Sequence, residues 1–427
     1  MVITGRRIRT VVVLALAGGL LSGCLSLGPS PAERAARDRN PEQESVEILT
    51  KKAKEGKVGA QLTLGKMYFE GRLVDQNYSK AVQWFREAAR VGNPPAQFNL
   101  GLCYDMGLGL KQDLEQALQW YRKAADQGVL QAQINAGVLL DRQGEEALAF
   151  RYLEMASGSG YLPAKRAVAR RYLEGVGVAV DEARAAELFE QAARAGDAES
   201  QVALARLHQE GRGVKQSVRE MVDWLWLAAE NDSAEGQTRL AYCYMNGVGI
   251  PGDRSLAVKW YRRAAEAGYT PAQVAYGNAL LEGTGVGRDE RAAAEWHAKA
   301  AENGDPLGQF SMGIAYLTAR GVRKDLERAV QWLQASAKQG YAQAEYHLGD
   351  LYETGEGVQK DATKAFAYYE RAARQNDPRA LAALGRCHLR GIGTQVDRDK
   401  ARRYLSTAAD MGLEDARKLL NQLESGE

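Results

Sequence analysis

Cysteine and histidine are the side chains of this 427-residue sequence that could supply redox or metal chemistry. After residue 40 the sequence contains three cysteines and four histidines: Cys103, Cys243, Cys387, His208, His297, His347 and His388. None of the histidines pairs with a cysteine or a carboxylate in a spacing typical of metal ligands, such as His-Glu-x-x-His. The sequence therefore predicts no metal site.

Motifs for covalent or nucleotide chemistry are also missing from the sequence. It contains no Ser-x-x-Lys, no Gly-x-Ser-x-Gly and no Gly-x-x-x-x-Gly-Lys. The run from Gly283 to Gly287, GTGVG, has the spacing of part of a dinucleotide loop, but it follows no predicted strand and joins two predicted helices. We expect no catalytic residue, no cofactor and no enzymatic activity.

The sequence that surrounds these residues is a repeat. We measure its period from Gly56, and the equivalent residues, called the ruler positions, are Gly56, Gly92, Gly128, Gly160, Gly196, Asp232, Gly268, Gly304, Gly340, Asn376 and Gly412. Each step is 36 residues except the 32-residue step from Gly128 to Gly160. Ten repeats and a final half-repeat, LEDARKLLNQL, predict one solenoid in place of several globular domains.

Each repeat is predicted to form two helices. The first carries a small residue nine positions after the ruler position and a bulky one three positions later, such as Gly101 and Tyr104. We expect the small residue to admit a neighbouring helix and the Tyr ring to fill the adjoining space. A Gly-x-Gly turn follows, and a capping residue then begins the second helix. The capping residues are Asn77, Asp113, Asp181, Ser217, Asp253, Asp289, Asp325, Asp361 and Asp397.

Aromatic residues recur at one position of the second helix, which we call the tryptophan column. Its members are Trp84, Trp120, Trp224, Trp260, Trp296 and Trp332, with Tyr152, Tyr368 and Tyr404 as substitutes. We interpret this column as core between helices; the alternative is a stacking platform for ligands. The three cysteines stand eleven residues after ruler positions and four repeats apart, too far for a disulfide, so we predict small buried apolar residues.

One repeat is four residues short. Between Gly128 and Gly160 the segment LLDRQGEEALA lacks the Gly-x-Gly turn. Two interpretations remain open: a bend of the solenoid near residues 141–146, or a deletion tolerated in a surface turn.

The first residues have the pattern of an export signal. Arg6, Arg7 and Arg9 precede a short apolar core, and the segment ends in Leu21-Ser22-Gly23-Cys24, which resembles the lipobox of bacterial lipoproteins. We predict a signal peptide at residues 1–23, a lipidated Cys24 with a flexible tether at 24–44, and the solenoid at 45–427. An ordinary secretory peptide and twin-arginine export are the alternatives. By resemblance to the bacterial sorting rule, Ser26 in place of Asp favours the outer membrane.

The net charge argues against a nucleic-acid partner. Lys and Arg number 56, and Asp and Glu number 54, for a formal charge of +2. Removal of residues 1–23 takes away three arginines and no acid, which leaves 53 basic and 54 acidic residues. A balanced chain of this kind lacks the general basic surface of a nucleic-acid-binding protein.

The repeat resembles the Sel-one-like repeat, the longer relative of the tetratricopeptide repeat. Residues 96–128, AQFNLGLCYDMGLGLKQDLEQALQWYRKAADQG, fit the family pattern almost throughout, and the resemblance covers about residues 45–424. It implies an all-α, right-handed superhelical solenoid of about ten two-helix repeats, whose concave groove binds other proteins. Some members carry a β-lactamase label, but this chain lacks the Ser-x-x-Lys spacing of such an enzyme.

The resemblance also implies that the first helices face the concave side. We call the residues ten positions after the ruler positions the first-helix column: Lys66, Leu102, Val138, Arg170, Arg206, Tyr242, Asn278, Ile314, Asp350 and Arg386. Within it, Arg170, Arg206 and Tyr242, together with Arg166 one turn before Arg170, are the candidate partner-binding residues. The arginines suit an acidic peptide or a polysaccharide carboxylate; the alternative is a solvated face.

Leu102 and Val138, with Phe98 and Ile134, suggest an apolar groove or ordinary core packing. The functional hypothesis is an outer-membrane-anchored scaffold, facing the periplasm, that binds other envelope proteins. The alternatives are a component that binds polysaccharide or peptidoglycan in envelope assembly or export, and a surface-displayed protein that interacts with a host.

Overall fold

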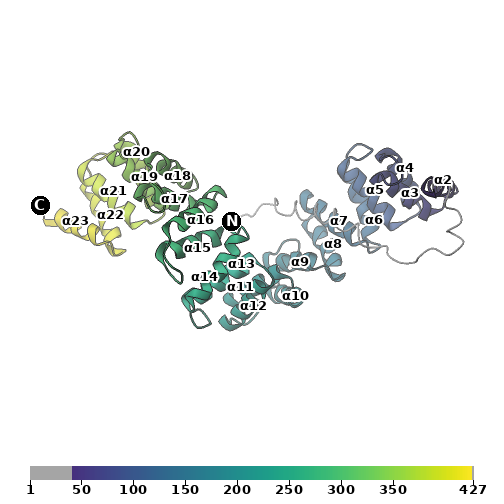
Figure 1. Cartoon of the computed structure of the whole chain (residues 1–427), viewed down its shortest axis with the longest axis horizontal. Helices are drawn as coiled ribbons and strands as arrows, with labels where there is room; N and C mark the ends of the chain where they lie inside the picture. The colour runs from purple at the N-terminus through teal and green to yellow at the C-terminus, as the bar shows by residue number, and fades with distance from the viewer. Residues whose placement is uncertain (1–40, 426–427) are drawn as a thin grey trace. The chain divides into compact units, whose positions relative to one another are not determined.

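The computed structural model describes residues 41–425 and shows 22 α-helices and no strand in that range. The expected signal peptide, Cys24 and most of the expected tether lie outside these residues. The helices, numbered as in Figure 1, are α2 (Pro41–Lys54), α3 (Val58–Glu70), α4 (Tyr78–Arg90), α5 (Pro94–Met106), α6 (Leu114–Ala125), α7 (Leu130–Gln143), α8 (Glu146–Gly158), α9 (Leu162–Glu174), α10 (Glu182–Arg194), α11 (Ala198–Glu210), α12 (Val218–Glu230), α13 (Ala234–Asn246), α14 (Arg254–Glu266), α15 (Thr270–Glu282), α16 (Glu290–Glu302), α17 (Pro306–Thr318), α18 (Leu326–Lys338), α19 (Ala342–Thr354), α20 (Ala362–Ala373), α21 (Pro378–Arg390), α22 (Arg398–Asp410) and α23 (Glu414–Ser425).

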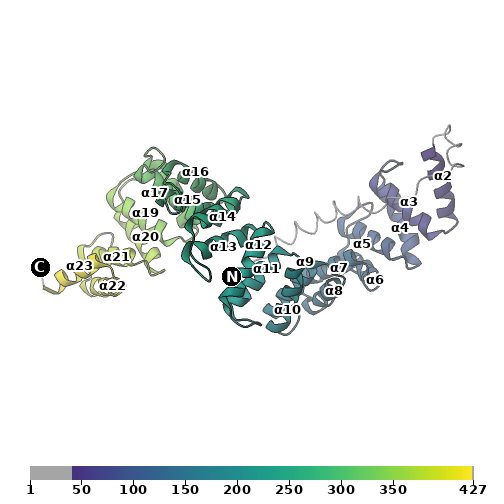
Figure 2. The same ribbon diagram turned by 60° about the horizontal axis from the view of Figure 1, so that its bottom comes forward.

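The chain divides into two compact units, one ending at Ser159 and the other beginning at Gly160. Unit 1 contains α2–α8 and unit 2 contains α9–α23. Within each unit, successive helices pack against one another as antiparallel pairs, as Figures 1 and 2 show for α5 with α6 and for α19 with α20. This arrangement confirms the predicted all-α solenoid of two-helix repeats. The first helix begins at Pro41, so it includes the last four residues of the expected tether.

The ruler positions share one backbone conformation. All eleven have a positive φ, between 58° at Asp232 and 91° at Gly412. Residues with a side chain rarely adopt this left-handed region, and Asp and Asn tolerate it best after glycine. The two departures from glycine, Asp232 and Asn376, are therefore the substitutions that this turn permits.

The two glycines of the Gly-x-Gly turn have different roles. The first ends the first helix in the left-handed conformation, and Ala319 takes the same conformation at this position with φ 59°. The second lies against the backbone of the preceding repeat: a Cβ at Gly213 would stand 1.9 Å from the carbonyl oxygen of Glu182. After the turn, each of the nine predicted capping residues accepts a backbone N–H bond, as Asp253 does from Leu256 at 2.9 Å.

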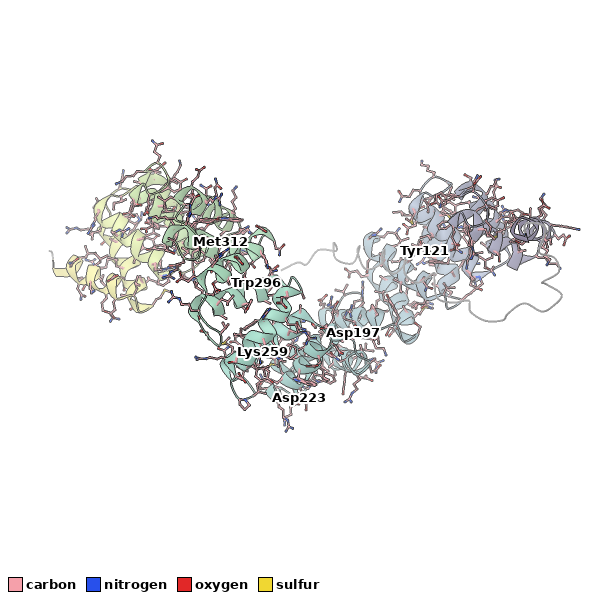
Figure 3. All side chains as sticks on the ribbon, viewed as in Figure 1. Tyr121, Asp197, Asp223, Lys259, Trp296 and Met312 are labelled. Carbon is pink, nitrogen blue, oxygen red and sulfur yellow. The ribbon has the colours of Figure 1, made fainter. Side chains whose placement is uncertain are left out.

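The core differs by one position from the prediction. All six tryptophans of the tryptophan column are half-buried, and the residues that fill the core stand one position later. These are Phe85, Tyr121, Leu153, Phe189, Leu225, Tyr261, His297, Leu333, Tyr369 and Leu405, none more than 8% exposed. They face the small residues of the first helices; a Cβ at Gly349 would lie 2.6 Å from the Tyr369 ring. Figure 3 labels Tyr121 in unit 1 and Trp296 in unit 2 as examples of the two positions.

The half-buried tryptophan column packs on the first helix of its own repeat. Tyr352 stacks on Tyr368 with 5.6 Å between ring centroids, and His388 stacks on Tyr404 at 5.8 Å. A basic side chain three residues later covers the outer face of several members, such as Lys299 at 3.6 Å from the Trp296 ring centroid. The column is thus structural, but it forms the edge of the core.

Buried amides link successive helices in a ladder that the sequence analysis did not identify. Five residues after seven of the ruler positions stands a glutamine whose Nε2 donates to a carbonyl eight residues earlier: Gln61, Gln97, Gln133, Gln201, Gln237, Gln273 and Gln309. In several repeats its Oε1 accepts from an amide thirty residues later, as from Gln127 to Gln97 at 2.8 Å. The ladder satisfies carbonyls at the ends of the second helices.

The short repeat keeps its helix pair. Only Gly144 and Glu145 separate α7 from α8, because Gly144 ends α7 in the left-handed conformation and α8 begins without a side-chain cap. Leu153 still packs on Gly137, 3.0 Å from a Cβ built there. The deletion therefore shortens the turn and preserves the packing of the pair, and the chain divides after Ser159, not at the short turn.

The three cysteines are buried as predicted, with exposures of 0% for Cys103, 2% for Cys243 and 0% for Cys387, and all are free. Burial raises the pKa of Cys103 to about 12 and that of Cys387 to about 11, with Glu353 adding to the latter shift. They remain protonated and unreactive at neutral pH. Of the described helices, none has the length and apolar character that a membrane span requires.

Candidate functional site

The candidate arginines of the first-helix column lie in unit 2 and carry ion pairs. Arg166 on α9 contacts Asp197 at 2.5 Å and Glu199 at 3.2 Å, and its side chain is only 15% exposed. Arg170 approaches Glu199 at 3.7 Å, and Arg206 approaches Glu210 at 4.0 Å. The structure thus places Arg166 and Arg170 around one carboxylate, Glu199, whereas Arg206 pairs with Glu210 on its own helix, and among the described residues no ion pair links Arg206 to the carboxylates of the other two arginines.

The hydrogen bonds of Asp197 account for the fixed position of the Arg166 side chain. It caps α11, accepting from the Ser200 amide at 3.0 Å and from the Ser200 hydroxyl at 2.5 Å, and Figure 3 labels it in unit 2. Burial acts to raise the pKa of Asp197, but the hydrogen bonds from Arg166 and Ser200 outweigh it and lower the pKa. Arg166 therefore stabilises the contact between α9 and α11, and its charge is largely used there.

Tyr242, the fourth candidate, projects from α13 and is 58% exposed. The next three members of the column, Asn278, Ile314 and Asp350, line a groove of about 560 Å³. We call it the α17 groove, because α17 forms its centre while α15, α16 and α19 contribute the rest. Tyr242 therefore lies one repeat before the groove. Asn278, Ile314 and Asp350 belong to the first-helix column, but they are not among the four candidate residues.

The floor of the α17 groove is apolar. Leu307, Phe310, Ile314 and Leu317 recur at three- and four-residue steps, so they share one face of α17. Phe310 is fixed by neighbouring rings, 5.2 Å from Tyr341 and 5.7 Å from His347 between centroids. This face is half-buried in the isolated chain and open to an additional apolar group.

The edges of the groove carry three carboxylates. Glu290 is paired with Arg288, and Glu356 accepts from Lys324 at 3.1 Å. Asp350 differs, because its carboxylate makes no ion pair and no hydrogen bond with any described residue, although it is half-buried. Of the nearby arginines, Arg386 donates to Glu353 at 2.6 Å and Arg379 pairs with Asp377 at 3.2 Å, while Arg320, exposed in the turn after α17, lines the groove without an ion pair among the described residues.

Both histidines of the groove are neutral at neutral pH. Burial lowers the pKa of His297, whose Nε2 lies 3.0 Å from Asn278 Oδ1. Burial and the nearby Arg379 charge lower the pKa of His347 more than Asp350 and Asp377 raise it. The histidines therefore add no positive charge to compensate Asp350.

Two further surfaces deserve comparison with the groove. Phe98 and Leu102 in unit 1 are half-buried against the core, with Phe98 5.8 Å from the Tyr121 ring, so their packing is largely internal.

Trp226 and Leu227 on α12 are 47% and 38% exposed. Other repeats carry a basic residue at the equivalent positions, such as Arg86 for Trp226 and Lys123 for Leu227. A comparison of the residue types at this position across the repeats identifies Trp226 as an exception from the sequence alone.

Within residues 41–425, no group of three or more His, Cys, Asp or Glu side chains is placed to hold a metal ion. The arrangement that the described residues offer is a surface for binding: an apolar floor, hydrogen-bonding edges and one uncompensated carboxylate.

Comparison with known proteins gives a consistent result. The family model of the Sel1 repeat matches nine segments: residues 58–93, 94–129, 162–197, 198–233, 234–269, 270–305, 306–341, 342–377 and 378–413. The short repeat is the part of this range that the family model does not match, although the structure retains its helix pair. No curated protein matches the sequence.

Solved structures agree with the family match. The structure of c5321, described as a protective antigen present in uropathogenic Escherichia coli strains and displaying an SLR fold, is 33% identical, covers 88% of this chain and 82% of its own, and has a TM-score of 0.72. A Sel1 repeat protein from Oxalobacter formigenes is 27% identical, covers 72% of this chain and 90% of its own, and has a TM-score of 0.54. With nine matching repeats and a relative of this similarity, the chain belongs to the Sel1 repeat family.

Proposed function

We propose that this protein is a scaffold that binds another envelope protein in the α17 groove. Sel1 repeat proteins generally mediate protein–protein interaction, and the family is generally non-enzymatic. The observation that carries the proposal is the apolar floor of Leu307, Phe310, Ile314 and Leu317, half-buried and lining the groove on the first-helix side of unit 2. Such a surface has the mixture of apolar area and polar edges that protein interfaces use.

We place the scaffold at the bacterial outer membrane, facing the periplasm and anchored through lipid on Cys24. This part of the proposal rests on the sequence pattern of Arg6, Arg7 and Arg9, the apolar core, and the lipobox-like Leu21 to Cys24. A Cys24→Ala variant tests it: the protein leaves the outer-membrane fraction of a density gradient if lipid at Cys24 holds it there, and stays in that fraction if it does not.

Two other functions have some support. Polysaccharide binding requires exposed aromatic side chains, and the chain exposes Tyr242 and Trp226, but the groove itself contains one aromatic ring besides its histidines, Phe310. Display on the cell surface is supported by the relative described as a protective antigen. Protease treatment of intact cells separates surface display from a periplasmic location, because only a displayed solenoid is accessible to cleavage.

The experiment that tests the scaffold is recovery of partners from cross-linked native envelopes. Ile314→Lys places a charge on the groove floor, and we expect it to remove the dominant partner protein. Val396→Lys is the matched control, because Val396 is 62% exposed in a turn where Lys324 and Lys360 occupy the same position. Recovery of the same partner with Ile314→Lys, from a protein with unchanged helical content, would refute the groove as the binding surface.

The Arg170→Glu, Arg206→Glu double variant belongs in the same experiment. It reverses two charges in the predicted basic patch, whose arginines pair with Glu199 and Glu210. Loss of the partner in this variant and its retention in Ile314→Lys would move the site to the neighbouring repeats. Recovery of glycan alone would favour the polysaccharide alternative.

A further inference from the structure

We infer that the α17 groove selects a peptide segment that presents an apolar side chain next to a basic group, a Lys or Arg side chain or a free amine, which pairs with Asp350. This inference rests on the proposed function and specifies the chemistry of the partner. The inference depends on two features: the apolar floor that α17 forms, and the Asp350 carboxylate on the neighbouring helix α19, which has no paired cation among the described residues.

The carboxylate of Asp350 is unusual among the acids on this face. Glu199, Glu210 and Glu353 each have an arginine from the first-helix column or one turn before it, at 3.2, 4.0 and 2.6 Å. Asp350 belongs to that column itself, and its side chain has no such cation within the described residues. Asp350 is half-buried, so water screens its charge less than that of a fully exposed acid, and a cation supplied by a ligand pairs with it more strongly than with an exposed acid.

The surroundings of Asp350 strengthen its preference for a cation. Tyr346 and Tyr369 lie close enough to the carboxylate to have their pKa values raised by it, after the larger effect of burial and, for Tyr369, of Glu353. Arg379 and Arg386 act on the Tyr346 pKa in the opposite sense, but each arginine is paired with another carboxylate, so neither is a direct partner of Asp350. The other unpaired charge that lines the groove, Arg320, is exposed in the turn after α17, where solvent screens it.

The separation between Ile314 and Asp350 determines how far apart the apolar and the basic residue of the bound peptide can be. Ile314 and Asp350 occupy equivalent positions in adjacent repeats, and both line the same groove. Neighbouring helices pack about 8–10 Å apart, which two or three residues of extended chain span. We therefore expect the basic residue within three positions of the apolar one.

Selection from a random dodecapeptide library displayed on phage tests the inference with the full-length chain. On the wild-type protein, we expect enrichment of peptides with Lys or Arg within three residues of Leu, Ile, Met or Phe. On the Asp350→Lys variant, we expect the basic residue to disappear from the selected peptides or to be replaced by Asp or Glu. Equal enrichment of basic residues on both proteins, or no enrichment on the wild type, would overturn the inference.

A binding measurement on the peptide most enriched on the wild-type protein gives the magnitude. Loss of one charge-assisted contact predicts about a tenfold weaker Kd for Asp350→Asn, and a similar loss when the peptide's basic residue is changed to Gln. The matched control is Asp223→Asn on α12, an acid 62% exposed and outside the groove, labelled in Figure 3, which leaves the Kd unchanged. A tenfold loss in both variants, or in neither, refutes the role of Asp350.

The two proposals fail in different ways. If Ile314→Lys removes the envelope partner while Asp350→Lys leaves peptide selection unaltered, the groove binds a protein and its basic preference is wrong. If neither variant affects partner recovery or peptide selection, the α17 groove is not the interaction surface.

Discussion

A single substitution at the end of α14 is expected to supply the hydrogen bond that the amide ladder lacks at Gln237. In four repeats the residue thirty positions after a ladder glutamine donates to its Oε1: Gln127 to Gln97 at 2.8 Å, Asn231 to Gln201 at 3.1 Å, Asn303 to Gln273 at 3.4 Å and Gln339 to Gln309 at 2.9 Å. At the same position after Gln237 stands Ala267, which has no donor, and Gln237 Oε1 is buried without a hydrogen bond. Ala267→Asn should supply the missing bond.

The backbone at Ala267 already suits asparagine. Its φ and ψ are −73° and 1°, and those of Asn303 at the equivalent position are −74° and 3°. Ala267 is exposed, so the new side chain meets no packed core before it reaches Gln237. A buried acceptor left unsatisfied costs about 1–3 kcal/mol, and part of this is recovered on bonding, so we expect a gain of about 1 kcal/mol.

Native-state hydrogen exchange is the suitable assay, because a solenoid unfolds locally and a single unfolding midpoint does not describe it. A gain of about 1 kcal/mol slows exchange of the α13 and α14 amides about fivefold. Ala195→Asn is the control: Ala195 has the same backbone position, but the ladder residue there is Lys165, which donates to Gln191. If Ala195→Asn slows amide exchange in its own repeat as much as Ala267→Asn does, the gain does not come from a hydrogen bond to the Gln237 oxygen.

Three further predictions test the core, the turn and a buried acid. Tyr261→Ala should destabilise the repeat by about 3–5 kcal/mol and Trp260→Ala by about 2 kcal/mol, because Tyr261 is buried while Trp260 is half-buried; hydrogen exchange of the α13 and α14 amides that ranks them the other way would contradict Tyr261 as the core residue. Gly213→Ala should cost more than Gly211→Ala, which costs about 1 kcal/mol, because only the Gly213 Cβ meets a backbone oxygen, and hydrogen exchange of the α11 and α12 amides that shows equal effects would exclude this contact. Glu345→Gln should stabilise by about 1 kcal/mol at neutral pH, since glutamine can restore the ladder bond. Burial raises the Glu345 pKa above its unfolded value, so ionisation destabilises the wild type as pH rises from the unfolded to the folded pKa. The gain should therefore shrink on acidification, and hydrogen-exchange protection of α18 and α19 that differs between the two proteins by the same amount at every pH would refute this cause.

The sequence predicts the features of this protein that depend on local geometry. The 36-residue period, the Gly-x-Gly turn and the capping residues each follow from the backbone requirements of a few neighbouring residues, and the structure shows all three. The first-helix column could also be predicted, because a residue's position on a helix follows from its spacing. This is why Asn278, Ile314 and Asp350 were in the predicted column before the groove was seen.

The sequence does not show which members of the first-helix column form a binding surface, because this depends on distances between side chains of different repeats. Arg170 and Arg206 are charged and lie in adjacent repeats, which favours them as candidates in the sequence, but the sequence does not show that Glu199 of the next repeat approaches Arg170. Tryptophan size favoured the wrong core position, since Trp260 and Tyr261 are both large and apolar and differ by only one step of the helix.

The sequence by itself thus determined the repeat, the turn between its two helices and the residue that caps each second helix, because these depend on interactions within a few residues of chain. Only the tertiary structure decided which aromatic is buried, which arginines are neutralised, that Gln237 lacks a partner, and that Asp350 stands uncompensated beside an apolar floor. The physical reason is that burial and charge pairing depend on separations between side chains from different helices, which the period does not specify.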